Sequence, residues 1–150
     1  MSALVSIIVP CYKQAHFLKD SLQSVLDQTY TSWQCIIVND GSPDDTEFKA
    51  LEWCSKDKRF SYLHKENGGL PSARNTGIAN SKGEFIVCLD SDDILHPDFL
   101  AQLVPELQAN DTLAIVSCYR YFFTKNKSNI IKEYKASGST YRDLMFENKL

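Results

Sequence analysis

Short apolar runs alternate with stretches of helical periodicity along the first half of the chain. The segment "LVSIIV" (4–9) is a short apolar run that ends at Pro10, and a run of this kind predicts a strand buried on both faces. From Phe17 to Leu26 the apolar residues recur at near-helical spacing, which predicts an amphipathic helix over about 15–28. Together the two segments form a first strand–helix unit.

The same order repeats further along the chain. The segment "QCIIVND" (34–40) predicts a second strand, and the residues after it predict a helix with Ser42 as a cap and Pro43 at the first helical position. The remaining predicted elements are a third strand over 60–65, a short helix opened at Pro71 and closed near Gly83, a fourth strand over 84–89, a helix over 96–109 that Pro105 kinks or shortens, and a long strand over 112–123.

This alternation predicts an α/β fold with three layers, α/β/α, around a mostly parallel, Rossmann-like sheet. Such sheets bind ligands at the carboxyl ends of their strands. A chain of 150 residues fits one ordinary domain, so we expect a single domain over 1–150. The segment "YRDLMFENKL" has no stop signal of its own, which fits a domain cut inside a larger enzyme.

Composition and charge limit the classes of protein to which the chain can belong. Apolar residues make up 43% of the chain, as in ordinary folded domains, and the formal net charge of −3 disfavours nucleic-acid binding, which requires a positive field. The five cysteines show no C-x-x-C pair, which favours a reducing compartment; four lie in apolar runs, where we expect them in the core. No window resembles a secretory leader or a membrane span, so we expect a cytoplasmic protein.

Polar residues follow three of the predicted strands at the point where each strand ends. They are Pro10–Tyr12, Asn39–Ser42 and Asp90–Asp93, and in a parallel sheet these segments meet at one edge. If 90–92 is extended, Asp90 and Asp92 point the same way while Ser91 faces elsewhere. Carboxylates this close favour a hard divalent cation, Mg²⁺ or Mn²⁺, held together with substrate phosphates.

Each of these segments also has a purely structural interpretation. Asp and Ser are favoured at helix caps and turns, so "DSDD" and "NDGSPDD" are compatible with capping alone. Asp40 is harder to explain in this way, because it ends an apolar strand where a carboxylate can accept from a ribose hydroxyl or a base N–H. Tyr12 is either a stacking platform for a base or a lone exposed tyrosine.

The segment "ENGGLPSARNTG" (66–77) supplies positive character opposite the acids. Gly68 and Gly69 permit backbone conformations closed to other residues, and a helix that begins near Pro71 directs N–H groups toward a phosphate. Arg74 lies in its first turn, where it contacts a phosphate, pairs with the acidic cluster, or is a plain surface residue.

Several enzyme classes lack their motifs here. There is no G-x-G-x-x-G after the first strand, no G-x-x-x-x-G-K-[ST] and no G-x-S-x-G, and the three histidines have no zinc spacing. A dinucleotide-binding enzyme, a P-loop protein and a serine hydrolase are therefore disfavoured.

In their order and spacing, the segments "VSIIVPCYKQ", "VNDGSPDDT", "NGGLPSARNTG" and "CLDSDD" resemble the inverting family 2 glycosyltransferases with the GT-A fold. The resemblance covers nearly the whole chain and implies a nucleotide-sugar donor, usually UDP-linked, and a divalent metal. In that family Asp40 reads the base, Arg74 lies near the diphosphate, Asp90 lies nearer the ribose and Asp92 lies toward the metal. The implied donor-binding residues are Pro10, Tyr12, Asp40, Gly69, Arg74, Asp90 and Ser91, with Asp92 at the metal.

The resemblance further implies inversion at the sugar, a glycan or lipid-linked acceptor and a cytoplasmic site, at the inner membrane face for lipid-linked acceptors. It places the general base in a later segment, beyond Leu150. Two alternatives stay open on the sequence: a non-catalytic nucleotide-binding module that keeps only the donor site, and a nucleotidyltransferase, which would need a glycine-rich signature near the first strand.

Overall fold

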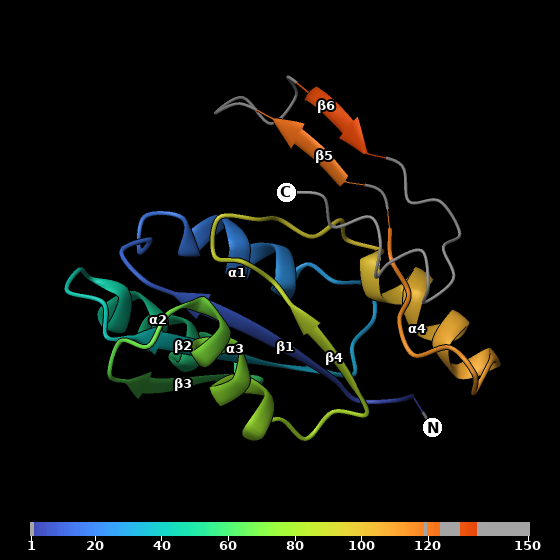
Figure 1. Ribbon diagram of the computed structural model, residues 1–150, viewed down its shortest axis with the longest axis horizontal. Helices are drawn as coiled ribbons and strands as arrows, with labels where there is room; N and C mark the ends of the chain where they lie inside the picture. Colours follow the sequence, from blue (N-terminus) through green and yellow to red (C-terminus); the bar gives the residue numbers. More distant parts are fainter. Residues whose placement is uncertain (1, 119, 124–129, 135–150) are drawn as a thin grey trace. The chain divides into compact units, whose positions relative to one another are not determined.

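The computed structural model describes residues 2–118, 120–123 and 130–134. In chain order the elements are β1 (Val5–Cys11), α1 (Leu18–Leu26), β2 (Trp33–Asp40), α2 (Thr46–Lys56), β3 (Phe60–Lys65), α3 (Leu70–Ala79), β4 (Phe85–Cys88), α4 (Phe99–Ala109), β5 (Arg120–Phe123) and β6 (Ile130–Tyr134) (Figure 1). The first four strands form one sheet in the order β3-β2-β1-β4, and every pair is parallel.

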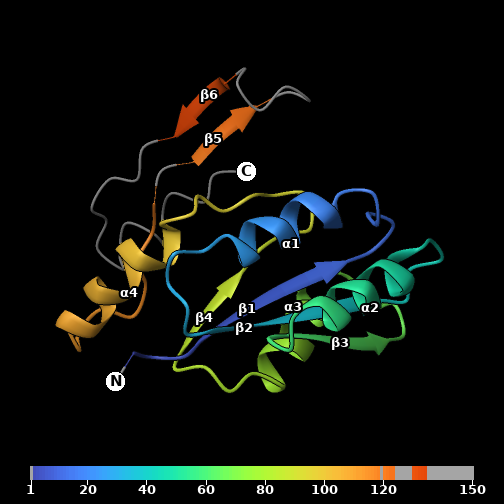
Figure 2. The same ribbon diagram turned by 180° about the vertical axis from the view of Figure 1, so that it is seen from behind.

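Helices cover both faces of this sheet. Ile7 of β1 packs in one cluster with residues of α1 and α2, whereas its neighbour Ile8 packs in a second cluster with Ala73 of α3. Successive side chains of a strand point to opposite faces, so α1 and α2 form one layer and α3 the other. Accordingly α3 lies in front of the sheet in Figure 1 and α2 lies in front in Figure 2. The predicted three-layer α/β architecture is confirmed.

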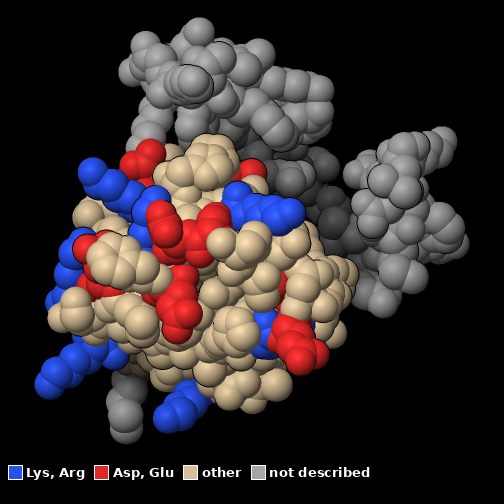
Figure 3. Space-filling view, turned by 90° about the vertical axis from the view of Figure 1, so that its left-hand side faces the viewer, with Lys and Arg blue, Asp and Glu red and all other residues tan. Residues whose placement is uncertain are grey.

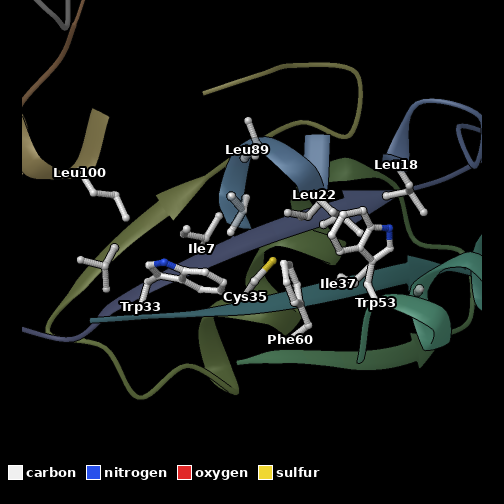
Figure 4. Packing of buried hydrophobic residues seen from close by; sticks show 14 of the residues in the cluster. Ile7, Leu18, Leu22, Trp33, Cys35, Ile37, Trp53, Phe60, Leu89 and Leu100 are labelled. Atoms are coloured by element: carbon white, nitrogen blue, oxygen red, sulfur yellow. The ribbon is translucent and has the colours of Figure 1, made fainter. Parts of the chain in front are cut away.

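The larger cluster is built around aromatic side chains on the α1–α2 face. The ring centroid of Phe60 lies 5.4 Å from that of Trp33 and 5.5 Å from that of Trp53 (Figure 4). Leu18 and Leu22 of α1 are fully buried against the same face. Because β1 is covered on both faces and paired on both edges, all seven of its residues are buried.

Helix α3 approaches the sheet closely at Gly77. A Cβ atom at this position would lie 2.2 Å from Cγ2 of Ile8 and 3.2 Å from Cγ2 of Val38. Glycine is therefore required by the packing of α3 on β1 and β2, which brings the helix start close to the strand ends.

We expect Gly77→Ala to destabilise the chain by about 1–3 kcal/mol through overpacking, although replacing glycine in a helix ordinarily gains about 1 kcal/mol. Urea denaturation measures this change. Because Ile8 supplies the nearest atom, Ile8→Ala should be less costly in the Gly77→Ala background than alone. A Gly77→Ala protein more stable than wild type would contradict the close approach.

The predicted long strand over 112–123 is wrong. Among the described residues of that range only Arg120–Phe123 forms a strand, in an antiparallel pair with β6, and Leu113 and Ile115 are exposed. An apolar run becomes a strand only with a partner, and within 2–118 no strand pairs with residues 112–118. Pro105 lies inside α4 and does not end it.

The expectation that four cysteines lie in the core holds for Cys11 and Cys35 only. Cys118 is partly exposed and Cys88 is exposed. Cys88 aligns with Ile8 in the sheet and so shares its face, but α3 packs over β1 and β2 and leaves the edge strand β4 uncovered there.

By its contacts the chain divides into two compact units, Met1–Val104 and Pro105–Leu150. The first contains the parallel sheet and the second contains the β5–β6 hairpin. The described part of the chain contains no helix that is both long and apolar enough to span a bilayer.

Candidate functional site

The candidate site lies at the carboxyl ends of the parallel strands. The strand order reverses at β1, because β2 lies on one side of it and β4 on the other. Such a switch point is where open α/β sheets bind ligands. Figure 3 views the side toward which the strands point and shows Asp and Glu gathered near the middle of this face, with Lys and Arg around them.

The loop after β1 presents an aromatic ring. Tyr12 is 42% exposed, and the ammonium of Lys13 lies 5.2 Å from the centre of its ring. Lys13 has a φ of 58°, so the chain turns sharply at this point. Pro10 is buried within β1, beyond the stretch that pairs with β4, where a residue without an N–H is tolerated. Of the two residues expected beside a base, Tyr12 is accessible and Pro10 is buried.

Asp40 ends β2 as predicted, and its side chain is only 3% exposed. Its Oδ1 accepts hydrogen bonds from Nζ of Lys65 at 2.7 Å and from the N–H of Gly68 at 3.0 Å, and its Oδ2 accepts from the N–H of Gly69 at 2.8 Å. Burial raises the pKa of Asp40, but these donors outweigh burial and hold the pKa below its ordinary value.

This arrangement makes Asp40 an anchor for the loop between β3 and α3. Any base N–H would have to share a carboxylate that already accepts three hydrogen bonds. A carboxylate has about four acceptor sites, so a base N–H would have to use the one left on Oδ2, on a side chain that is only 3% exposed. The N–H groups of Gly68 and Gly69, just before the helix expected to face a phosphate, are turned toward this carboxylate.

Helix α3 brings its arginine to the acids that follow β4. The helix begins after Gly69, whose φ of 82° is a conformation that glycine adopts without strain. Arg74 lies in the second turn of the helix, and its Nη2 donates to Oδ1 of Asp90 at 2.5 Å. Its Nε is buried without a hydrogen-bond partner among the described residues. Of the interpretations of Arg74 left open by the sequence, pairing with the acidic cluster is the one observed.

The acids themselves occupy a turn. The N–H of Asp93 donates to the carbonyl oxygen of Asp90 at 3.0 Å, so the expectation that 90–92 is extended is wrong. The turn sends the two carboxylates to different partners: Asp90 to Arg74, and Asp92 to the side-chain amide of Gln14 at 3.3 Å. Ser91 is fully buried, and its hydroxyl donates to the same Gln14 amide that Asp92 contacts, so the expectation that it faces elsewhere is wrong as well.

A second carboxylate ties the loops after β1 and β2 together. Asp44 accepts from the N–H of Ala15 at 3.0 Å and from the hydroxyls of Ser42 and Thr46. Burial raises the pKa of Asp44, but hydrogen bonds from these three residues lower it to about 2. Ser42 belongs to this network and is not the cap of α2, which begins at Thr46.

Sequence reasoning missed three residues of this site: Gln14, Asp44 as a connector, and Lys65. Gln14 follows the first strand, so the strand-end argument applied to it as it did to Tyr12. Asp44 lies two residues from both Ser42 and Thr46, a spacing typical of side-chain turns. Lys65 carries no such signal, because its partner Asp40 is distant in the sequence.

The residues fit a divalent cation that takes most of its ligands from a substrate. No group of three or more His, Cys, Asp and Glu side chains suited to a metal occurs among the described residues. Asp92 is exposed at the site, and its carboxylate is a hard oxygen donor of the kind that Mg²⁺ and Mn²⁺ prefer. Mg²⁺ is commonly held by one or two carboxylates together with substrate phosphates, and the site offers this donor set.

Comparison with known proteins identifies the family to which this chain belongs. The family model for Glycosyl transferase family 2 matches residues 6–149. An uncharacterized glycosyltransferase of Rickettsia prowazekii, RP339, is 39% identical over 128 residues, which is 85% of this chain and 39% of that protein.

Solved structures with the same fold include a mannosyltransferase and the protein TarS. A mannosyltransferase of Pyrobaculum calidifontis, solved with GDP-Man and Mn²⁺, superposes with a TM-score of 0.67 at 24% identity over 79% of this chain and 36% of that one. S. aureus TarS 1-349, solved with UDP-GlcNAc, gives a TM-score of 0.65 at 25% identity over 70% of this chain and 31% of that one. The chain spans less than two fifths of the length of each of these three proteins.

Proposed function

The chain belongs to glycosyltransferase family 2, and we propose that it binds a UDP-linked sugar donor for metal-assisted transfer to an acceptor hydroxyl with inversion. The observation that carries this proposal is the group at the switch point: the exposed Asp92 beside the Arg74–Asp90 ion pair. A cation bound to a diphosphate would pair with the Asp92 carboxylate, and the phosphate oxygens would pair with the Arg74 guanidinium. Structures of proteins with this fold support it, since one holds GDP-Man with Mn²⁺ and another holds UDP-GlcNAc.

In the proposed donor complex the base stacks on Tyr12, whose ring is exposed in the loop after β1. Pro10 lies in β1, two residues before Tyr12, and Asp40 holds Gly69 at the start of α3 on the β2 side of the proposed donor site. The Arg74 guanidinium has five N–H donors, of which one is given to Asp90, so it retains donors for a phosphate. Asp90 lies toward the ribose, and the buried Ser91 holds the turn.

Departure of a nucleoside diphosphate leaves negative charge on its phosphate oxygens. A divalent ion, Mn²⁺ or Mg²⁺, would be held by Asp92 and would neutralise part of that charge. Arg74 adds a fixed positive charge on the same side, and its pairing with Asp90 orients it before the donor arrives. These residues bind and orient the leaving group.

The acceptor side of the reaction needs a general base on the opposite face of the sugar. We place this base beyond Leu150, with a glycan or lipid-linked acceptor and a cytoplasmic setting that includes the inner membrane face. The partial coverage of longer relatives supports this placement.

Calorimetric titration of the chain with UDP, with Mn²⁺ and then with EDTA, tests the donor site. We expect binding with Mn²⁺, loss of binding in EDTA, and weaker binding of GDP. Equal binding of GDP would contradict the assignment of uracil, and no binding of either nucleotide would contradict the donor site. Nucleotide binding without hydrolysis or transfer of UDP-sugars would favour a non-catalytic module.

A further inference from the structure

Gln14 lies on one side of the switch point and the acidic turn lies on the other. It follows β1 in the loop that leads to α1, while Ser91 and Asp92 follow β4, the next strand in the sheet. The residues are 77 and 78 positions apart in the sequence, yet their side chains meet across the site. A ligand at the switch point would therefore contact the surface that these two loops form together.

The amide of Gln14 makes two hydrogen bonds of opposite polarity. Its Oε1 accepts from the hydroxyl of Ser91 at 2.5 Å, and its Nε2 donates to Oδ2 of Asp92 at 3.3 Å. The carboxylate only accepts, so the NH₂ group must face Asp92. Asp92 thus fixes the orientation of the amide, and the hydroxyl of the buried Ser91 donates to the oxygen on the other side.

The backbone on either side of Gln14 is held as well. The N–H of Lys13 donates to Oγ of Ser42 at 2.8 Å, and the N–H of Ala15 donates to Oδ2 of Asp44 at 3.0 Å. Both acceptors belong to the loop after β2. The backbone on both sides of Gln14 is therefore fixed by hydrogen bonds, and the Gln14 side chain connects this fixed segment to the acidic turn.

We propose that Gln14 is a positioning residue of the donor site, which holds the exposed Asp92 carboxylate in one orientation through its Nε2. A side chain that must be immobilised on binding weakens that binding, and partners that orient metal ligands typically change metal affinity by about 10–100-fold. The metal part of this inference rests on the proposed function; the orientation of Asp92 does not.

The test is Gln14→Met, which keeps the length of the side chain and removes both hydrogen bonds. Gln23→Met is a matched control, because Nε2 of Gln23 donates to the exposed Asp27 at 2.7 Å in the same kind of bond, within α1. Two measurements are made on each protein: the Mn²⁺ concentration at the midpoint of UDP binding, and the backbone amide shifts of Ser91 and Asp92 in the metal-free protein.

For Gln14→Met we expect a midpoint about tenfold higher in Mn²⁺, changed amide shifts at Ser91 and Asp92, and a thermal midpoint lower by a few degrees, because the hydroxyl of the buried Ser91 loses its acceptor. Gln23→Met should change none of these. Unchanged amide shifts, or an unchanged Mn²⁺ midpoint in a wild type that binds UDP, would overturn the inference. If wild type binds no nucleotide with Mn²⁺, the proposed function fails, and the amide shifts still decide whether Gln14 holds the turn.

Discussion

Asp92→Ala is expected to weaken UDP binding in Mn²⁺ by about a hundredfold, equivalent to about 2.8 kcal/mol. The substitution removes the carboxylate proposed to hold the cation, and the described residues offer no cluster of acids to replace it. Isothermal titration with UDP and Mn²⁺ measures the loss. The unfolding free energy should change little, since Asp92 is exposed and accepts one long hydrogen bond, from Gln14.

Asp27→Ala is the matched control for this experiment. Asp27 is also an exposed carboxylate that accepts from a glutamine amide, and it lies at the end of α1. Its removal should leave UDP binding unchanged. If Asp92→Ala binds UDP as wild type does while Asp90→Ala does not, Asp90 is the metal ligand and the two roles are reversed.

The strands and the edge that carries the site were predictable because each rests on local sequence. The run 60–65 became β3 with the predicted bounds, and Asp40 and Asp90 were identified because they follow apolar runs. Parallel pairing then brings strand ends together whatever the details of the loops. The parts of the site that depend only on strand order were therefore accessible from the sequence.

The parts that depend on contacts between distant loops were not accessible. Lys65 reaches Asp40 because β3 lies beside β2, and Gln14 reaches Asp92 because β4 lies beside β1. The sequence of the acidic segment is compatible with an extended conformation or with a turn. Only the structure shows the hydrogen bond that closes the turn. Lys65 and Gln14 could therefore be identified as the partners of these acids only once the order of the strands in the sheet was known.

Asp40→Ala should cost about 3 kcal/mol of unfolding free energy, as removal of one partner of a buried ion pair typically does. It leaves the Lys65 ammonium, which is 19% exposed, and the N–H groups of Gly68 and Gly69 without their acceptor. Asp57→Ala is the matched control: the Asp57–Arg59 pair has the same 2.7 Å separation, but its side chains are 24% and 35% exposed. We expect its loss to cost about 0–1 kcal/mol.

The acid side of the stability curve provides a second measure of the same anchor. The folded pKa of Asp40 lies below its ordinary value of 3.8, so its contribution is complete above that value and disappears as the pH falls through the folded pKa. Lys65→Met removes a lowering influence and leaves burial, which raises the pKa; the loss should therefore begin at a higher pH than in wild type. Urea denaturation across the acid range measures both proteins.

Asp40→Ala should not show this part of the loss of stability at acid pH, because the group that titrates has been removed. If Asp40→Ala and Asp57→Ala cost the same, or if Lys65→Met leaves the acid limb unchanged, Asp40 does not anchor the loop between β3 and α3. A large cost confined to Asp40→Ala would instead mean that this carboxylate fixes the loop that leads into α3, so that Arg74 on that helix is in place before the donor arrives.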